Sequence, residues 1–600
     1  MAGVASVAVM ASTLGTSPGA PASGATSGTQ LQYSSPASIK SQGAGQTSAP
    51  SSAAPSDAFA SGTLASRGGP YLVDRYGRTV TLHGVNAVYK YAPFELYPDP
   101  GQPWNFDASD AKEIAALGFN VVRLGILWEG IEPGTVGAND PSICTPGTPR
   151  APSQFNSTTA DAYLAKLTKT VDLLGKYHVY VLLDMHQDVY SQPFRGEGAP
   201  AWAICTDGQA IVPSGGRWST NYNNPTLEIA ESHFWSNDVV GNLQGSYDQS
   251  WAVVAKHFAN NPWVVGYDPY NEPSSRDLTP GGPVSFAVQL ECFYTGRAHP
   301  GSLTIGGGPV TCPADDPLQG VVPTIENADP HHLVFIEPDN FSVRQELPSL
   351  LGTMGFPRLV YNFHAYCGNR SPVTGDPYDP TACSDQLLRN MGFRFQDRPK
   401  MASAQQPGGP AWFMSEFGAT SNVEFLDQAT DYAGTLDLGW IYWSWKYYND
   451  PTGSSDEALA LPDGQLAPSA AALSQPYAQA IAGTFLSATF QQDGRVYQLV
   501  YQPSSQIQAP TSIFTAAAEQ YPGGYCASAA GGSIVSPAGA AHLLVTADRQ
   551  TNRVVVTIKA GSCNAPTPPP APTSPAPSTS TTSTSTTTTS TTSTPTTTTP

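Results

Sequence analysis

Two glutamates in this chain have the positions that paired carboxyl chemistry requires. Glu272 lies in the string YNEP and Glu416 in the string SEFG, and each follows a short apolar run. A positioned carboxyl group can act as an acid, a base or a nucleophile, and two together can divide these tasks. A single glutamate at the end of a strand is more often a salt-bridge partner than a catalyst. Two of them, accompanied by Trp, Tyr, His and Asn at similar positions, favour a catalytic pair.

Polar and aromatic residues end the other apolar runs in the same way. They are His83, Asn86, Arg123, Trp128, Asp184, His186, Asp188, Asn271, His364, Tyr366, Trp443 and Trp445. Asp184, His186 and Asp188 alternate along one run, but a single histidine between two carboxylates is a weak pattern for a metal site. We therefore expect neither a metal ion nor another cofactor. An alternative stays open in which Arg123 and His186 only stabilise the fold and Trp445 is ordinary core packing.

Eight short apolar runs must position these residues. They cover residues 80–86, 120–127, 179–186, 263–271, 333–338, 359–366, 411–418 and 439–445. Each is nearly continuous in β-branched, aromatic or aliphatic residues, as parallel strands buried on both faces are. Helical patterns separate them, such as the apolar face of Leu164, Leu167, Val171 and Leu174. Eight such alternations predict an α/β fold, a (β/α)8 TIM barrel, whose active site lies at the C-terminal ends of the strands.

The two ends of the chain differ from this core. From about residue 484 apolar and polar residues alternate around turn signals, which predicts a small antiparallel β-sandwich. Residues 1–66 are mostly Ala, Ser, Gly and Thr, and residues 564–600 are almost entirely Thr, Ser, Pro and Ala, so we expect both to be disordered. We therefore divide the chain into a signal remnant and linker (1–66), a barrel (67–482), a sandwich (483–563) and a tail (564–600).

Charge and hydropathy exclude several classes of partner. The net charge of −19 opposes binding to a nucleic-acid backbone or to an anionic membrane surface. No run of 18 apolar residues is present, so we expect no transmembrane segment. The chain begins MAGVASVAVMAS, which is similar to the end of a signal h-region without its basic start, and this indicates a true start further upstream.

The cysteines indicate an oxidising compartment. There are eight, with no CxxC pair and no zinc-like spacing, so we expect four disulfides. Sequence proximity favours the pairs 292–312 and 367–383, and the pair 526–563 follows if the last two cysteines lie in a separate module. We expect a secreted or cell-envelope-associated monomer, with the Thr/Ser-rich tail as a disordered spacer or as a tether to the envelope.

The strand-end strings resemble a known clan of enzymes. The set HGVN, VVRLGILW, LLDMHQD, YNEP, NFHAY, SEFG and WSW resembles the retaining glycosidases that include glycoside hydrolase family five, in the expected order over the whole barrel. The longer strings HGVNAVYKYAPFELYPDPG and LLDMHQDVYSQPFRGEGAPAW are similar to those of the endoglycoceramidases, which also carry a C-terminal β-sandwich. The resemblance implies hydrolysis of the β-glucosyl bond between the glycan and the lipid of glycosphingolipids.

The resemblance also implies roles for individual residues. Glu272 matches the general acid/base and Glu416 the nucleophile, whose carboxyl groups should lie about 5–5.5 Å apart for retention of configuration. The matching positions that would bind or orient the sugar and these carboxyls are Lys90, Arg123, His186, Asp188, Asn271, His364, Tyr366 and Trp443. Among them Asn271 would bind the sugar 2-OH, Arg123 and Tyr366 would hold the nucleophile, and Trp443 would stack beneath the sugar.

Two other functions remain open at this point. One is a β-glucanase or another β-glycosidase of the same family, and the other is a non-catalytic carbohydrate-binding protein of the envelope. Residues 193–235 bear on the choice, because this long connection is rich in Gly, Pro and aromatics. Long loops often serve as lids or binding loops. We expect its aromatics, Trp202 and Trp235 among them, to clasp a sugar or to line a groove for lipid chains.

Overall fold

The structure is a computed structural model. It describes residues 62–133, 155–215, 218–237, 243–274, 282–296, 304–305, 308–309, 312, 320–340, 343, 346–366, 380–449, 452 and 455–563. All of these lie within one compact unit of the chain, which begins at residue 53. Cys144 and Cys367, residues 1–61 and residues 564–600 lie outside the described residues, and with them the expected disorder of both ends.

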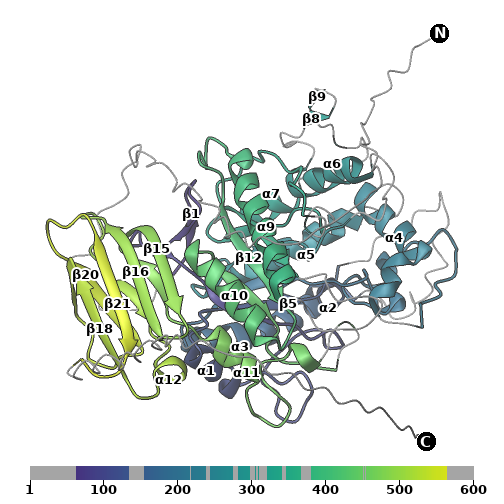
Figure 1. The fold of residues 1–600 in the computed structure, drawn as a ribbon. Coiled ribbons are helices and arrows are strands. Elements are labelled where there is room, and N and C mark those ends of the chain that lie inside the picture. Colours follow the sequence, from purple (N-terminus) through teal and green to yellow (C-terminus); the bar gives the residue numbers. More distant parts are fainter. Residues whose placement is uncertain are drawn as a thin grey trace, which may run out of the picture. The chain divides into compact units, whose positions relative to one another are not determined.

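Eight parallel strands close into a barrel in the order β4–β5–β6–β7–β10–β11–β12–β13 (Figure 1). Their bounds are β4 His83–Ala87, β5 Val121–Ile126, β6 Tyr180–Met185, β7 Val264–Asp268, β10 Leu333–Ile336, β11 Leu359–Ala365, β12 Ala411–Gly418 and β13 Trp440–Trp443. Every residue of these strands is buried, because helices cover the outside of the barrel and side chains fill its inside. The predicted TIM barrel is thereby confirmed.

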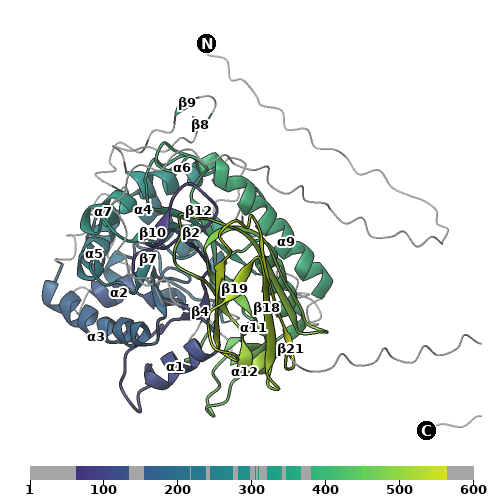
Figure 2. The ribbon, with the colours of Figure 1, turned by 90° about the vertical axis from the view of Figure 1, so that its left-hand side faces the viewer.

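Helices surround the strands of the barrel (Figure 2). They are α1 Ala108–Ala116, α2 Trp128–Ile131, α3 Ser157–Lys176, α4 Pro225–Ser236, α5 Leu243–Phe258, α6 Gly282–Thr295, α7 Val321–Ala328, α9 Pro380–Asp397, α10 Val423–Thr435 and α11 Pro468–Leu473. Asp107 caps α1 and exchanges hydrogen bonds with Asp110 in a capping box, which satisfies backbone donors at the helix start. Gly118 has a φ of 84°, so the chain can leave α1 in a left-handed turn.

Two antiparallel sheets are built mostly from strands that follow the barrel in sequence. One is four-stranded, in the order β15 (Gly483–Gln491), β16 (Val496–Pro503), β21 (Val554–Ala560) and β18 (Tyr525–Ala530). The other has seven strands in the order β1–β2–β3–β14–β17–β20–β19, where β14 is Tyr477–Ile481, β17 Thr511–Phe514, β20 His542–Ala547 and β19 Gly532–Ile534. Apolar residues of both sheets share one core, as in a sandwich.

The second sheet joins the two ends of the chain. Its first three strands are β1 (Ala65–Ser66), β2 (Leu72–Val73) and β3 (Thr79–Val80), which precede the barrel. Strand β3 pairs with β14 through Val80 and Ala480. Short β-strands before the barrel therefore belong to the same sheet as strands that follow it, an arrangement that the sequence pattern did not predict.

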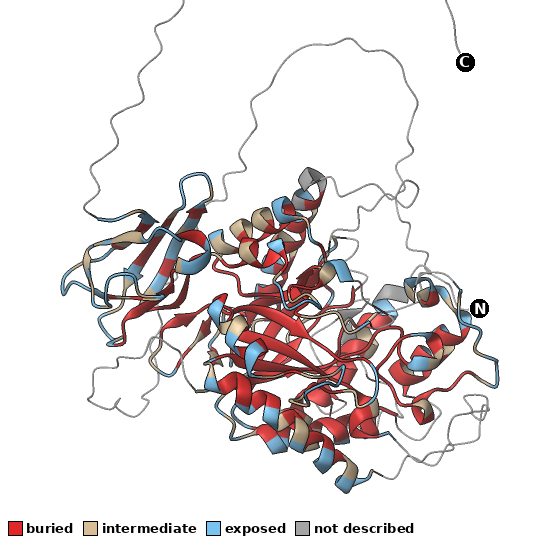
Figure 3. Ribbon diagram, turned by 90° about the horizontal axis from the view of Figure 1, so that it is seen from below, coloured by how far each residue is buried: buried red, intermediate tan, exposed pale blue. Residues whose placement is uncertain are grey.

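The barrel and the sandwich differ in how far their residues are buried (Figure 3). The barrel strands are uniformly buried, whereas β15 alternates between buried and exposed residues along its length. This difference reproduces the continuous and the alternating apolar patterns of the sequence. Among the described residues no helix is long and apolar enough to cross a membrane.

Disulfides join four of the described cysteines in two pairs. Cys292 pairs with Cys312, and Cys526 pairs with Cys563, so both of these predictions are confirmed. Cys383 is also disulfide-bonded, but its predicted partner lies outside the described residues. Cys205 is disulfide-bonded as well.

The prediction of a long binding loop at residues 193–235 is wrong in part. Residues 225–236 form helix α4, which Asn224 caps through its side-chain oxygen. Trp235 is buried against Tyr270 and Phe286, and the indole N–H of Trp202 donates a hydrogen bond to the backbone of Glu132. These two tryptophans are core residues, because burying a large aromatic ring against other rings is favourable. They line no groove for lipid chains.

Candidate active site

Glu416 lies in β12, and donors from β5 and from the end of β11 surround its carboxyl group. The guanidinium of Arg123 in β5 donates to Oε1 at 2.5 Å, and the hydroxyl of Tyr366, just after β11, donates to Oε2 at 2.7 Å. The imidazole Nδ1 of His364 in β11 lies 3.4 Å from Oε2. Burial raises the pKa of Glu416, and the positive charges of His364 and Arg123 oppose that shift. These donors favour the ionised form that a nucleophile needs.

Glu272 follows β7, and its carboxyl group has two side-chain partners. Asn340 donates to Oε2 at 2.7 Å, and Nδ1 of His364 lies 2.9 Å from Oε1. The backbone of Glu272 has a φ of 48°, a left-handed conformation that costs free energy for a residue with a Cβ. Strain of this kind concentrates where a side chain must be aimed into a site.

The two glutamates face one another across a cavity. A carboxylate oxygen of Glu272, a carboxylate oxygen of Glu416 and a ring nitrogen of His364 all lie within 4.8 Å of one another. Carboxyl groups about 5–5.5 Å apart suit a double displacement, whereas an inverting enzyme needs about 6.5–9.5 Å to admit a water. The cavity has a volume of about 410 Å³, which suits a small ligand. Its lining includes Glu272, Glu416, His186, Asp188, Asn271, His364, Tyr366 and Trp443.

Arg123 is the fully buried cation of the site. Its guanidinium contacts four carboxylates, those of Asp184, Asp268, Glu337 and Glu416, at 2.5–3.5 Å. Burial alone would lower the pKa of Arg123, but these carboxylates raise it well above its usual value. A buried charge of this kind is tolerated only when it is paired and hydrogen-bonded. Arg123 thus holds the carboxylates at the base of the cavity in one arrangement.

Asn271 belongs to this network. Its side-chain oxygen accepts a hydrogen bond from Arg123 at 2.9 Å, and its amide donates to the backbone oxygen of Gln187, also at 2.9 Å. An amide nitrogen has two hydrogens. The second hydrogen can serve a ligand, because Asn271 also lines the cavity.

Lys90 organises a second group of charges beside the cavity. Its ammonium lies 2.9 Å from Asp188 and 3.0 Å from Glu197, and it lies 4.7 Å from the centre of the Trp443 ring. His186 stacks on the same indole ring, with the ring centres 5.3 Å apart. Asp184 and Asp188 raise the pKa of His186 to about 9 against the effect of burial. Lys90 and Asp188 therefore hold each other in place beside the Trp443 ring.

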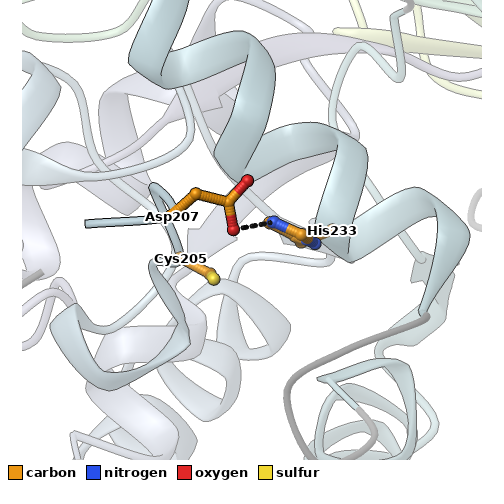
Figure 4. A group of neighbouring side chains, drawn as sticks. All are labelled: Cys205, Asp207 and His233. Carbon is orange, nitrogen blue, oxygen red and sulfur yellow. Dashed lines mark hydrogen bonds and ion pairs between the residues drawn. The ribbon is translucent and has the colours of Figure 1, made fainter. Parts of the chain in front are cut away.

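In the part of the chain that the structure describes, three groups of side chains have spacings that a metal ion could use. In the group of His186, Asp188 and Glu197, the ammonium of Lys90 already lies within 3.0 Å of both carboxylates. In the group of Cys205, Asp207 and His233 (Figure 4), the cysteine is disulfide-bonded and has no thiolate to offer. The third group is the catalytic pair with His364.

The structure brings all ten predicted site residues together. Two other residues that were expected at strand ends, His83 and Trp445, lie away from the site. His83 is the first residue of β4, so it lies at the opposite end of the barrel, stacked between Trp440 and Tyr477. Trp445 is fully buried and donates a hydrogen bond to Asp110, so it is a core residue.

Several residues of the site were missed from the sequence. Asn340, Thr452 and Glu457 line the cavity, and Glu197 and Glu337 contact its charged residues. Trp218 and Tyr222 also line the cavity, but they belong to the aromatics of residues 193–235 that were expected to bind a ligand. Glu337 had a signal, because it lies near the end of the predicted fifth strand, in the string IEP. The others lie in connections whose path only the folded chain defines.

A closed parallel barrel with two facing carboxylates at the ends of its strands defines a glycoside hydrolase of the double-displacement type. Comparison with known families gives the same class. Residues 73–449 match the model described as cellulase (glycosyl hydrolase family 5), and residues 475–560 match the model of the C-terminal domain of glycoside hydrolase family 5. The chain therefore belongs to glycoside hydrolase family 5, which confirms the family resemblance of its sequence.

Individual relatives are similar to the chain over most of its length. Endoglycoceramidase I of Rhodococcus hoagii is 28% identical over 518 residues, covering 83% of this chain and 89% of the relative. An endoglycoceramidase of Hydra vulgaris is 25% identical, covering 76% of this chain and 80% of the relative. The solved structure of endo-glycoceramidase II from Rhodococcus sp. in complex with ganglioside GM3 has a TM-score of 0.63 and 24% identity, covering 82% of this chain and 99% of that one.

Proposed function

We propose that this protein is a retaining endo-type β-glycosidase that releases the glycan of glycosphingolipids from the lipid. The observation that carries the chemistry is the approach of the Glu272 and Glu416 carboxylates to within 4.8 Å, with a cavity between them. The lipid-linked substrate is supported by the relatives, of which those from Rhodococcus hoagii and Hydra vulgaris are both endoglycoceramidases.

In the first step Glu416 acts as the nucleophile. Its carboxylate attacks the anomeric carbon, the bond from that carbon to the aglycone oxygen breaks, and Glu272 donates a proton to the leaving oxygen. Arg123, His364 and Tyr366 stabilise the Glu416 carboxylate before the attack. The products of this step are the free lipid alcohol and a glycosyl ester on Glu416.

In the second step Glu272 acts as the base. It takes a proton from a water molecule, the water oxygen attacks the anomeric carbon, and the ester bond to Glu416 breaks. Two inversions leave the released glycan with its original β configuration. Asn271 is positioned to hydrogen-bond the sugar 2-OH, a contact that strengthens in the transition state.

The side of the cavity near Trp443 suits a sugar ring. The indole, with His186 and Lys90 packed on it, offers an aromatic surface beside the charged groups. Asp188 lines the cavity and accepts hydrogen bonds from Lys90 and from the hydroxyl of Tyr222. We assign the binding of sugar hydroxyls to His186 and Asp188, which line the cavity, and to Lys90 the role of holding Asp188 in place for that contact.

We also propose that the protein acts outside the cell or attached to its envelope. The disulfides Cys292–Cys312 and Cys526–Cys563 support an oxidising compartment. The Thr/Ser-rich composition of residues 564–600 would suit a spacer to the envelope.

A mechanism-based label tests the chemistry. A 2-deoxy-2-fluoro β-glycoside with a good leaving group should form a stable ester, and peptide mass spectrometry should locate it on Glu416. Proton NMR of the first product should show the β anomer. A label on another residue, or an α anomer, would contradict the proposal. Glu272→Gln should still accept the label from the activated glycoside while its hydrolysis of glycolipid falls by about 10²–10⁴-fold.

A substrate comparison tests the lipid specificity. We expect higher kcat/KM for a detergent-dispersed glycosphingolipid than for soluble β-glucans. The alternative is a β-glucanase, which the description of the matched barrel model as a cellulase favours. Preference for the glucans would establish that alternative, and binding without turnover of any of them would indicate a non-catalytic carbohydrate-binding protein.

A further inference from the structure

Glu337 is a buried carboxylate behind the active-site cavity. It follows β10 and has an exposed fraction of 3%. The hydroxyl of Tyr294 both donates to its backbone oxygen, at 3.0 Å, and accepts from its backbone N–H, at 3.1 Å. Glu272 and His364 line the cavity, and Glu337 contacts both of them from outside that lining. Its effect on a bound substrate therefore passes through the residues that it contacts, which are Glu272, His364 and, at 3.5 Å, Arg123.

The first contact fixes the backbone of Glu272. The backbone N–H of Glu272 donates to Oε2 of Glu337 at 3.2 Å. Glu272 has a φ of 48°, a conformation that persists only where its surroundings hold it. A hydrogen bond to a charged acceptor at this N–H is one such restraint. Glu337 thus helps to fix the direction in which the Glu272 side chain leaves the backbone.

The second contact is with the imidazole of His364. Its Nε2 lies 3.1 Å from Oε1 of Glu337, while its Nδ1 lies 2.9 Å from Glu272 and 3.4 Å from Glu416. Both ring nitrogens therefore lie within 3.4 Å of carboxylate oxygens, and the imidazolium, which carries a proton on each nitrogen, suits these negative charges better than the neutral ring does. Burial alone would lower the pKa of His364, but Glu337 and Glu416 raise it well above its usual value.

Glu337 differs from the other two carboxylates that contact the imidazole. Glu272 gives up and regains a proton in the proposed reaction, and Glu416 loses its charge when it forms the ester. Glu337 takes no part in bond making, so its charge can stay constant throughout. The other titratable or charged groups around these carboxylates are Arg123, Asp268, Tyr366 and His186.

We propose that Glu337 is a positioning residue, which keeps a cationic His364 between the two catalytic carboxyls and holds the backbone of Glu272 in its strained conformation. This inference rests on the proposed retaining mechanism, and it adds the carboxylate of Glu337 to the two carboxyl groups that this mechanism uses. The cationic imidazole stabilises the charge of Glu416 before attack and the charge of Glu272 after it has donated its proton.

The substitution Glu337→Gln tests the proposal, because it keeps the shape of the side chain and removes its charge. We expect His364 to lose its proton in the working pH range. Both limbs of the kcat/KM profile should then move to higher pH, since a neutral imidazole no longer favours the two carboxylates. At the pH optimum of the unmodified protein we expect kcat for a glycolipid to fall at least about tenfold, a part of the 10²–10⁴-fold effect of acid–base catalysis. KM should change little, because Glu337 does not line the cavity.

A double-mutant cycle separates this role from general destabilisation. In the His364→Gln background the further change Glu337→Gln should leave the pH limbs where they are, because the imidazole that transmits the effect is absent. Glu95→Gln is a matched control. Glu95 is equally buried and lies 3.0 Å from Lys166, away from the cavity, so its substitution should not move the limbs.

A spectroscopic measurement provides a readout that does not depend on turnover. In full-length protein with 15N-labelled histidine, both ring nitrogens of His364 should carry protons at pH 7, with the signal assigned from the His364→Gln spectrum. In Glu337→Gln the same ring should titrate within the accessible range. If Glu337→Gln does not fold, Glu337→Asp serves, and its shorter carboxylate should move the limbs in the same direction by a smaller amount.

The outcomes distinguish this inference from the proposed function. If the limbs of the kcat/KM profile stay in place in Glu337→Gln and His364 stays protonated, the inference is overturned. Limbs that move to lower pH would also overturn it, because His364 would then be cationic without Glu337. Limbs that move equally in the His364→Gln background would show a role that does not pass through the imidazole, which also overturns it. Failure of the unmodified protein to hydrolyse any β-glycoside would instead refute the proposed function.

Discussion

At the scale of single residues, the ionisation of Glu416, the proposed nucleophile, depends on the hydrogen-bond donors that reach its carboxyl group. Arg123, Tyr366 and His364 all contact Glu416, and burial works against them by raising its pKa. A nucleophile must be ionised to attack. The acid limb of the pH profile therefore reports the balance between these donors and burial.

Removing one of the donors should move that limb. Tyr366→Phe deletes the hydrogen bond to Oε2 of Glu416 and leaves the carboxylate less stable relative to its protonated form. Its pKa should rise, so activity should be lost at a higher pH as the solution is acidified. The measurement is kcat/KM against pH with an activated aryl β-glycoside, for which the proton donor matters least.

Tyr267→Phe is the matched control for this substitution. The hydroxyl of Tyr267 donates to the buried carboxylate of Asp329 at 2.5 Å, outside the cavity lining. Its loss should lower stability and leave the acid limb unchanged. An acid limb that stays in place in Tyr366→Phe would show that this hydroxyl does not set the ionisation of Glu416.

At the scale of elements, the segment between β6 and α5 has two distinct parts. Helix α4 and Trp202 contribute aromatic rings to the barrel core, whereas Trp218 and Tyr222 line the cavity. The same residue type therefore serves stability at one position and ligand binding at another. The difference is burial, which the spacing of the aromatics does not reveal.

This division predicts opposite results for two tryptophans. Trp235→Ala should lower the free energy of unfolding by about 3–5 kcal/mol, because it leaves a cavity beside Tyr270 and Phe286. Trp218→Ala should change stability little and raise KM for the glycan, because its ring is partly exposed in the cavity. Urea denaturation and steady-state kinetics on both variants give the comparison. A stable Trp235→Ala with altered lipid preference would restore the binding-loop interpretation.

At the scale of the whole molecule, strands from both ends of the chain share one sheet. Strand β3 precedes the barrel and pairs with β14, which follows it. The hydroxyl of Tyr477 in β14 donates to the backbone of Gly118, at the end of α1. The sandwich thereby contains strands from both sides of the barrel sequence and contacts the end of the barrel helix α1, so we expect the two parts to unfold together.

The disulfide Cys526–Cys563 tests that expectation. It joins β18 to Cys563, three residues beyond the end of β21, across a sequence separation of 37. Replacing both cysteines by serine should lower the free energy of unfolding by about 3–4 kcal/mol in the chain-entropy model. Calorimetry should show one transition at a lower temperature than in the unmodified protein. A separate early transition would show instead that the sandwich unfolds independently of the barrel.

Local patterns in the sequence predicted the repeating architecture. Each barrel strand is an almost continuous apolar run, because it is buried on both faces, whereas sandwich strands such as β20 and β21 alternate, because only one of their faces is buried. The approach of the two glutamates was predictable for a related reason. In a parallel barrel the strand ends meet at one face, so Glu272, Glu416 and Arg123 must approach one another wherever they lie in the chain.

Contacts between distant segments were decided only by the tertiary structure. Trp235 and Trp218 look alike in sequence, but packing buries one and leaves the other in the cavity. Pairing of β3 with β14 joins residues 400 apart, and no local pattern encodes such a partner. The same holds for Glu337, whose position after a strand was visible in the sequence. That its carboxylate reaches both His364 and the backbone of Glu272 depends on side-chain directions, which are set only when the barrel closes.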